Sequence, residues 1–174
     1  LADTGDNLKV RASCAIYRAA EPVELTDGTL PVEALPFTYP DGPRDVEAML
    51  VHPITGVITL VTKTLGLSEI YELPMPLTPG SSVVAIKRGT ISLPIEPAFV
   101  TGGDVHPDAK SVLLRTYANA YDFRMIAGAT VADALLGEAC EVPLAVEPQG
   151  EAIGWLADGK GYVQEMKLPW KLIT

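Results

Sequence analysis

The sequence predicts an all-β fold, a β-propeller of four-stranded antiparallel blades, and three observations support this prediction. Fifteen prolines and fifteen glycines divide the 174 residues into short pieces. Many of these pieces carry apolar and β-branched residues in alternation or in runs, as strands do. One pattern, an acid or a threonine followed five residues later by a turn, recurs about every fifty residues. A single β-sandwich is the alternative, which explains the strands but not the recurrence.

The expected strands follow one another from residue 49 to the end of the chain. They cover residues 49–53, 56–63, 68–74, 82–89, 91–95, 111–118, 121–128, 141–146, 152–157, 161–166 and 170–174. Helical periodicity is nearly absent. Only the segment 129–139 tolerates a helix, and Gly128 and Gly137 bracket it.

Three turns anchor the repeat. They begin at His52, His106 and Leu156, which are spaced 54 and 50 residues apart. Each turn is followed by a second strand and then by a third strand with an aromatic residue near its middle, at Tyr71, Phe123 and Trp170. A four-stranded sheet cannot bury both of its faces alone and therefore stacks radially on its neighbours. We expect blade units at residues 1–43, 44–100, 101–147 and 148–174, within one domain.

The number of units predicts an incomplete ring. Residues 1–7 match the end of a second strand and its loop, and residues 170–174 match a third strand with no fourth. About three and a half blades are too few for the ring closure that removes sheet edges. Either the chain is a fragment, or a second copy or another partner completes the ring.

Four motifs resemble a family of secreted bacterial β-propellers related to the esterase-like phytase and SdiA-regulated groups, which are similar to NHL propellers. They are "ADTGDNLKVRASCAIYRAAEP" (2–22), "DVEAMLVHPITGVITLVTK" (45–63), "TGGDVHPDAKSVLLRTYANAYDF" (101–123) and "PQGEAIGWLADG" (148–159). The resemblance covers nearly the whole chain. It implies a ring of five or six blades, further blades before Leu1 and a secreted or periplasmic location. It implies no particular substrate.

Oxygen-bearing side chains recur at the start of the innermost strand of each unit. Glu47, Thr101 and Glu151 share this position, with Asp45 and Gln149 two residues before the glutamates. In a propeller these side chains converge on the central channel, and converging oxygen ligands in an acidic protein suit Ca²⁺. We therefore take Glu47 and Glu151 as candidate catalytic residues, and as candidate metal ligands Glu47, Glu151, Asp104 and Asp45. A metal on the axis would polarise a carbonyl or phosphoryl group and activate a water molecule.

The same acids have a structural interpretation that stays open. A buried carboxylate must be paired or hydrogen-bonded, and each acid could hold a backbone donor of the neighbouring blade. Lys63 and Arg115, at the ends of second strands, are expected to line the mouth of the channel together with Thr101 and Gln149, where a small-molecule or protein ligand would bind. An ion pair with a neighbouring glutamate is the alternative role of these two cations.

His52 and His106 each precede a proline at the same position of the repeat, which indicates a turn. Neither is expected to act as a general base or a metal ligand, because a catalytic histidine needs a partner within hydrogen-bond reach. The sequence also lacks the G-x-S-x-G motif of serine hydrolases and the glycine motifs of nucleotide-binding proteins.

The composition narrows the range of partners. A net charge of −9 argues against nucleic acid, which needs clustered Lys and Arg. No run of apolar residues is long enough to predict a membrane span. Cys14 and Cys140 lie in different repeats, and we leave open whether they are separate core residues or form a disulfide.

Two classes of function remain. The first is a metal-dependent hydrolase of esterase, lactonase or phosphoester type that uses Glu47 and Glu151. The second is a non-catalytic scaffold whose rim loops bind a protein or a saccharide, since one fold serves many functions.

Overall fold

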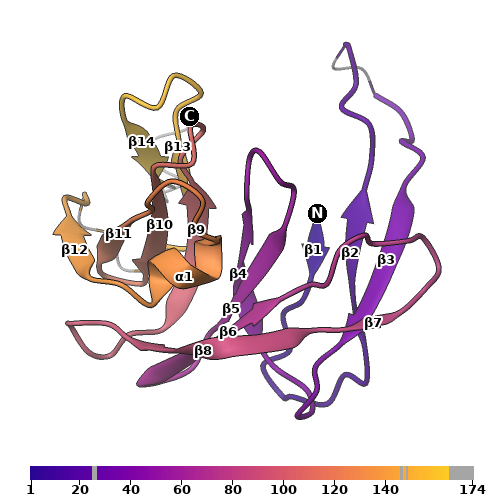
Figure 1. Cartoon of the computed structure of the whole chain (residues 1–174), viewed down its shortest axis with the longest axis horizontal. Helices are drawn as coiled ribbons and strands as arrows, with labels where there is room; N and C mark the ends of the chain where they lie inside the picture. Colours follow the sequence, from indigo (N-terminus) through magenta and orange to yellow (C-terminus); the bar gives the residue numbers. More distant parts are fainter. Residues whose placement is uncertain (25–26, 146, 148, 165–174) are drawn as a thin grey trace, which may run out of the picture.

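The computed structural model describes residues 1–24, 27–145, 147 and 149–164. Within these residues, fourteen strands form three four-stranded sheets and one hairpin, and one short helix accompanies them (Figure 1). The prediction of an all-β protein with four-stranded sheets is confirmed. The strand expected at residues 170–174 lies outside the described residues.

We name the sheets A to D in chain order. Sheet A contains β1 (Ala2–Asp3), β2 (Cys14–Arg18), β3 (Glu33–Thr38) and β7 (Val83–Val84). Sheet B contains β4 (Val46–Val51), β5 (Ile58–Thr62), β6 (Leu67–Glu72) and β8 (Ile86–Ser92). Sheet C contains β9 (Val100–Val105), β10 (Ser111–Thr116), β11 (Ala120–Arg124) and β12 (Ala139–Val142). Sheet D is the hairpin of β13 (Ile153–Trp155) and β14 (Tyr162–Gln164).

Sheets B and C are antiparallel meanders, but sheet A departs from the expected pattern in two ways. Its fourth strand, β7, comes from the connection between β6 and β8 and pairs with β3 in parallel, so the prediction of purely antiparallel sheets is wrong here. The crossing covers the outer edge of β3, which would otherwise present unpaired backbone groups. Residues 2–3 form the first strand of this sheet, although the sequence predicted the end of a second strand.

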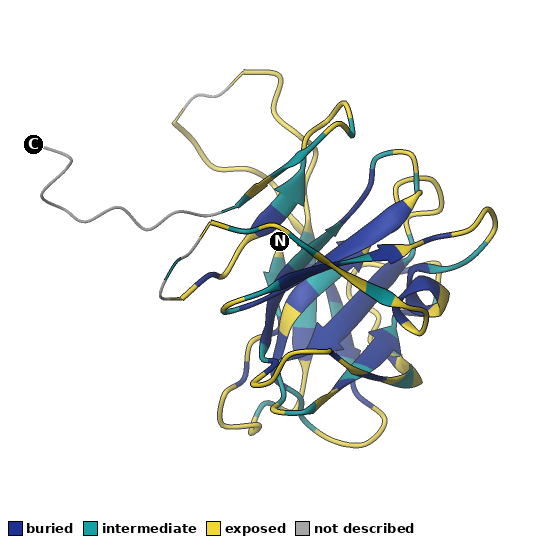
Figure 2. Cartoon of the chain, turned by 90° about the vertical axis from the view of Figure 1, so that its left-hand side faces the viewer, coloured by how far each residue is buried: buried dark blue, intermediate teal, exposed yellow. Residues whose placement is uncertain are grey.

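The sheets pack against one another in chain order, and a hydrophobic core lies at each seam (Figure 2). Neighbouring residues of one strand contribute to opposite cores. In β5, Leu60 packs toward sheet A and Val61 toward sheet C. In β10, Leu114 packs toward sheet B and Leu113 toward sheet D. Sheets B and C are therefore covered on both faces, and β9 lies between β4 and β13.

The helix is shorter than the segment predicted to tolerate one. α1 (Val131–Leu135) begins at a capping box in which Thr130 and Asp133 bond each other's backbone N–H groups. It ends at Leu135, and after the C-cap residue Leu136 the N–H group of Gly137 donates to the carbonyl of Ala134. Val131, Ala132, Ala134 and Leu135 are buried against sheets B and C, so the helix closes one end of the core at that seam.

The three predicted turns have matching hydrogen bonds. In each, the N–H group of the anchor residue donates to the carbonyl of the residue five positions later: His52 to Val57, His106 to Ser111 and Leu156 to Gly161. Each turn also contains a residue with positive φ: Gly56, Ala109 or Gly159. Ala109 is unusual, because a residue with a Cβ atom is strained in this left-handed region. The repeat of the turns predicted from the sequence is confirmed.

We expect Gly159→Ala to lower the free energy of unfolding by about 2 kcal/mol. Its φ of +66° disfavours a side chain, and a Cβ atom here would lie 2.6 Å from the imidazole of His106. Urea unfolding followed by circular dichroism measures the change. The control is Gly28→Ala, where a Cβ atom has no neighbour within 4 Å. Equal stability of the two variants would contradict the close approach of the turn to His106.

Candidate functional site

Asp45 joins sheet B to sheet A. The side chain is buried, and its Oδ1 accepts a hydrogen bond of 2.7 Å from the backbone N–H group of Asp6, which follows β1. One residue further, the hydroxyl of Thr4 donates to the carbonyl of Val46 at 2.9 Å. Asp45 therefore satisfies a buried backbone donor of the neighbouring sheet, as the structural interpretation of the acids predicts.

Glu47 is paired with Lys63. Its Oε1 lies 3.5 Å from the Nζ of Lys63, which in turn lies 5.2 Å from the ring centre of Tyr117. Burial alone lowers the pKa of Lys63, but the hydrogen bond with Tyr117 and the charge of Glu47 outweigh it and raise this pKa above its ordinary value. Lys63 therefore carries its charge at neutral pH, and Glu47 faces a cation from its own sheet.

Thr101 and Asp104 of β9 join sheet C to sheet D. The hydroxyl of Thr101 donates to the carbonyl of Gly150 at 2.8 Å. The two carboxylate oxygens of Asp104 accept backbone N–H groups, Oδ1 from Val105 and Oδ2 from Trp155, both at 2.8 Å. Asp104 at this seam therefore has the role that Asp45 has at the first seam.

Arg115 is buried in the seam between sheets C and D, so the expectation that it frames an open channel mouth is wrong. Its side chain is 1% exposed and forms an ion pair of 3.3 Å with Glu147. It also donates to the carbonyl of Ala152 at 3.1 Å. Gly150 lies directly on the guanidinium, where a Cβ atom would be 1.6 Å from its Nη2. Glu147 was missed in the sequence, since a single acid between prolines carries no local signal.

Glu151 and Gln149 precede β13 and are exposed. The carbonyl of Glu151 lies over Gly102, where a Cβ atom would be only 2.5 Å away, so glycine lets the two backbones approach. Because β9 lies between β4 and β13, it separates the strand of Glu47 from the segment of Glu151. The two glutamates predicted as catalytic belong to sheets that are not neighbours.

The donor set does not fit the calcium site predicted from the sequence. Among the described residues, no three His, Cys, Asp or Glu side chains form a group that could hold a metal ion. Asp45 and Asp104 direct their oxygens toward backbone N–H groups instead. Of the four predicted ligands, Asp45 and Asp104 join seams between sheets, Glu47 pairs with Lys63, and Glu151 is exposed before β13.

A charged cluster holds the linker between sheets A and B. The Tyr71 hydroxyl donates to Asp41 at 2.9 Å, and Arg44 and Lys87 bridge Asp41 to Glu69. Burial and the hydrogen bond to Asp41 raise the pKa of Tyr71 to about 12. Burial opposes ionisation of Asp41 and Glu69, but the surrounding donors and cations lower the pKa of each carboxyl. The two cations neutralise the two carboxylates, which suits a role in holding the linker in place.

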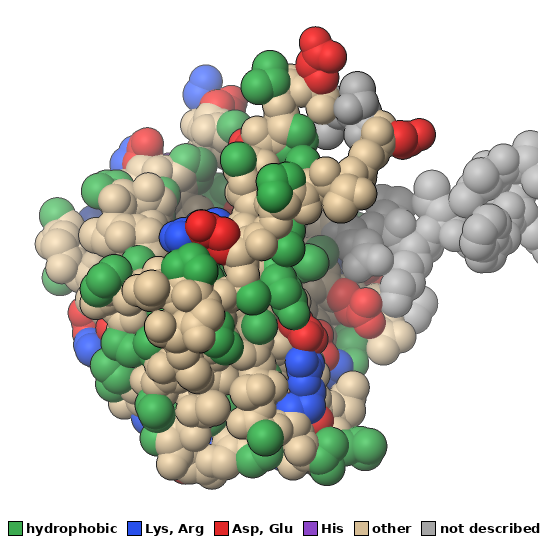
Figure 3. All heavy atoms as spheres, turned by 90° about the vertical axis from the view of Figure 1, so that its right-hand side faces the viewer, with side chains coloured by type: hydrophobic (Ala, Val, Ile, Leu, Met, Phe, Trp, Pro, Cys, Tyr) green, Lys and Arg blue, Asp and Glu red, His purple; other side chains and the backbone are tan. Residues whose placement is uncertain are grey.

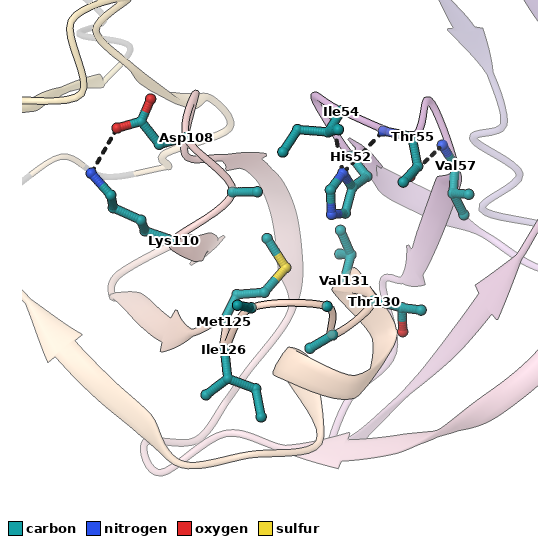
Figure 4. A pocket seen from close by; sticks show the side chains of 14 residues that line it. His52, Ile54, Thr55, Val57, Asp108, Lys110, Met125, Ile126, Thr130 and Val131 are labelled. Carbon is teal, nitrogen blue, oxygen red and sulfur yellow. Dashed lines mark hydrogen bonds and ion pairs between the residues drawn. The ribbon is translucent and has the colours of Figure 1, made fainter.

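Both histidines lie in turns, as predicted, and both use Nδ1 as an acceptor for backbone N–H groups of their own turn. They differ at the other ring nitrogen. The Nε2 of His106 lies 3.2 Å from the carbonyl oxygen of Gly159. The rings of His106 and Trp155 pack edge to face, with their centroids 4.8 Å apart. His52 borders a pocket instead (Figure 4).

The pocket has a volume of about 490 Å³ and lies between three loops at the turn end of sheets B and C. The loops are 52–57, 108–110 and the segment 125–131 that leads into α1. Its walls are mostly aliphatic, and Ile54 and Ile126 beside it are exposed. The sequence alone does not reveal this site, because the loops come from three separate parts of the chain.

Comparisons with known proteins add no evidence about these sites. No family model matches the chain, and no curated protein matches it. Among the described residues, no helix has the length and apolar character needed to cross a bilayer. Cys14 is buried and Cys140 exposed, and neither forms a disulfide.

We expect Asp45→Ala to lower the free energy of unfolding by about 2 kcal/mol, because the buried N–H group of Asp6 loses its acceptor. Chemical denaturation in the presence and in the absence of EDTA measures this loss of stability. The loss should be the same under both conditions. The control Glu138→Ala, at an exposed position, should change stability little. A loss seen only without chelator would instead indicate a metal ligand.

Proposed function

We propose that the chain is part of a β-propeller and acts as a non-catalytic binding module whose ligand occupies the pocket at the turn end of sheets B and C. One observation carries the proposal: Asp45 and Asp104, two of the predicted metal ligands, accept backbone N–H groups at the seams, whereas the pocket of about 490 Å³ beside His52 is open and lined mostly by aliphatic side chains. Such a pocket has the size and character of a ligand site.

The packing of the sheets supports the propeller. In a two-layer sandwich each sheet has one covered face, but sheets B and C are covered on both faces. Successive sheets with their first strands side by side are the arrangement of propeller blades.

Sheet A supports a larger ring. Cys14, Ile16, Leu35 and Phe37 face sheet B, and the alternate residues face the other way. Those outward residues are Ala15 opposite Pro36 and Tyr17 opposite Ala34, all without charge. Hydrophobic side chains are visible on the side of the molecule where sheet A lies (Figure 3). A sheet that is apolar on both faces is one that is buried on both faces, so we propose that a further sheet covers it.

We expect the isolated chain to self-associate through this face, giving a mass above 18.5 kDa in size-exclusion chromatography with light scattering. Ala34→Glu places a charge on the face and should yield a monomer. Ala118→Glu, at an exposed position in sheet C's loop, should leave the association unchanged. A wild-type chain that is monomeric at high concentration would contradict a covered outer face.

The hydrolase hypothesis makes a different prediction about calcium. If Glu47 pairs only with Lys63, titration calorimetry should show no saturable heat of Ca²⁺ binding in the wild type or in Glu47→Gln. Saturable Ca²⁺ binding in the wild type that is lost in Glu47→Gln would support the hydrolase hypothesis instead. Circular dichroism of both proteins shows that each is folded.

The pocket also narrows the kind of ligand. Its lining contains no Trp, Tyr or Phe, on which sugar rings commonly stack. We therefore favour an apolar small molecule or an apolar side chain of a protein over a saccharide. A secreted or periplasmic location is a proposal that rests on the resemblance alone.

A further inference from the structure

His52 has a defined tautomer. Its Nδ1 accepts the backbone N–H groups of Ile54 at 3.2 Å and Thr55 at 3.3 Å. An acceptor nitrogen carries no proton, so the neutral ring carries its proton on Nε2. The side chain is nine-tenths buried, with 9% of the residue's surface exposed. His52 therefore has one N–H donor left after the turn is satisfied.

That donor faces the pocket. Figure 4 shows the His52 ring on one side of the pocket, above Val131, with Met125 on the opposite side. Within the described part of the chain, no side chain or carbonyl accepts a hydrogen bond from this Nε2. The Nε2–H group is therefore available to an acceptor that enters the pocket, and a ligand that supplies one gains a hydrogen bond.

The repeat explains why only one of the two histidines is left with a free donor. At the seam of sheets C and D, Gly159 brings its carbonyl to the Nε2 of His106. A Cβ atom on Gly159 would lie 2.6 Å from that ring. At the seam of sheets B and C the matching position is Ala109, which has this Cβ atom and also lines the pocket. The turn therefore cannot approach His52 in the same way.

A second difference between the two repeats also favours an open pocket beside His52. Trp155 packs edge-on against His106, whereas the position that matches Trp155 in sheet C is Val105. Valine has a much smaller side chain than tryptophan and cannot cover a histidine in the way that Trp155 covers His106. The pocket is thus the open counterpart of a contact that is closed one sheet further along the chain.

We propose that the pocket binds a ligand with an apolar body and one hydrogen-bond acceptor, a carbonyl or carboxylate oxygen, that receives the Nε2–H group of His52. Ile54, Met125, Ile126 and Val131 supply the apolar walls. The proposal rests on the proposed function and adds the chemistry by which the pocket selects its ligand, since a ligand without an acceptor cannot form the hydrogen bond with His52.

The test compares two probes of similar size, acetophenone and ethylbenzene, of which only acetophenone has an acceptor. Both are titrated into ¹⁵N-labelled protein, and the amide shifts of Ile54, Thr55 and Ala129 report binding at the pocket. We expect acetophenone to bind about five-fold more tightly, the worth of one hydrogen bond.

Three variants separate the explanations. His52→Asn keeps an acceptor near the position of Nδ1 for the turn but removes the donor at Nε2, so it should abolish the preference. His106→Asn is the matched control at the closed seam and should retain it. Ala127→Phe, at an exposed position of the pocket wall, should weaken both probes.

The outcomes distinguish this inference from the proposed function. Equal binding of both probes in the wild type, lost in Ala127→Phe, would overturn the donor role of His52 and leave the pocket as a binding site. A preference that persists in His52→Asn would also overturn that role. If neither acetophenone nor ethylbenzene binds the wild type, both the donor role of His52 and the proposed binding function are overturned. Thermal unfolding of each variant shows that the fold is retained.

Discussion

The structure depends on sheets that are apolar on both faces. In β5 and β10 every residue is buried, because alternate side chains enter two different cores. Such a strand cannot remain at the surface, so each sheet needs a neighbour on both sides. This constraint orders the sheets along the chain and leaves sheet A with an uncovered face.

Polar groups at the seams fulfil a second requirement of this packing. Where backbone of one sheet meets backbone of the next, N–H and carbonyl groups leave water and need partners. Asp45 provides a partner at the seam of sheets A and B, and Asp104 and Arg115 provide partners at the seam of sheets C and D. Asp45 and Asp104 thereby have a structural role at the junctions of the sheets.

Function, in our proposal, arises where the repeat is broken. His52 and His106 occupy the same turn position and form the same Nδ1 hydrogen bonds. One seam closes over its histidine through Gly159 and Trp155, and the other stays open beside Ala109. A repeat protein can thus gain a binding site by changing a glycine to a residue with a Cβ atom.

The sequence by itself determined the all-β class, most strand positions in sheets B to D and the three matching turns. These features are local: alternation of side chains and turn residues act within a few positions of the chain. Sheet A was largely missed, because β1 has only two residues and β2 and β3 are joined by a long connection that gives no local hairpin signal.

Only the tertiary structure decided the partners of the polar residues and the location of the pocket. The pairing of Arg115 with Glu147, the crossing of β7 to β3 and the space between His52 and Ala109 each join segments that are far apart in the chain. Side-chain type gives the chemistry that a residue can perform. Its neighbours across a seam decide whether that chemistry holds the sheets together or remains available to a ligand.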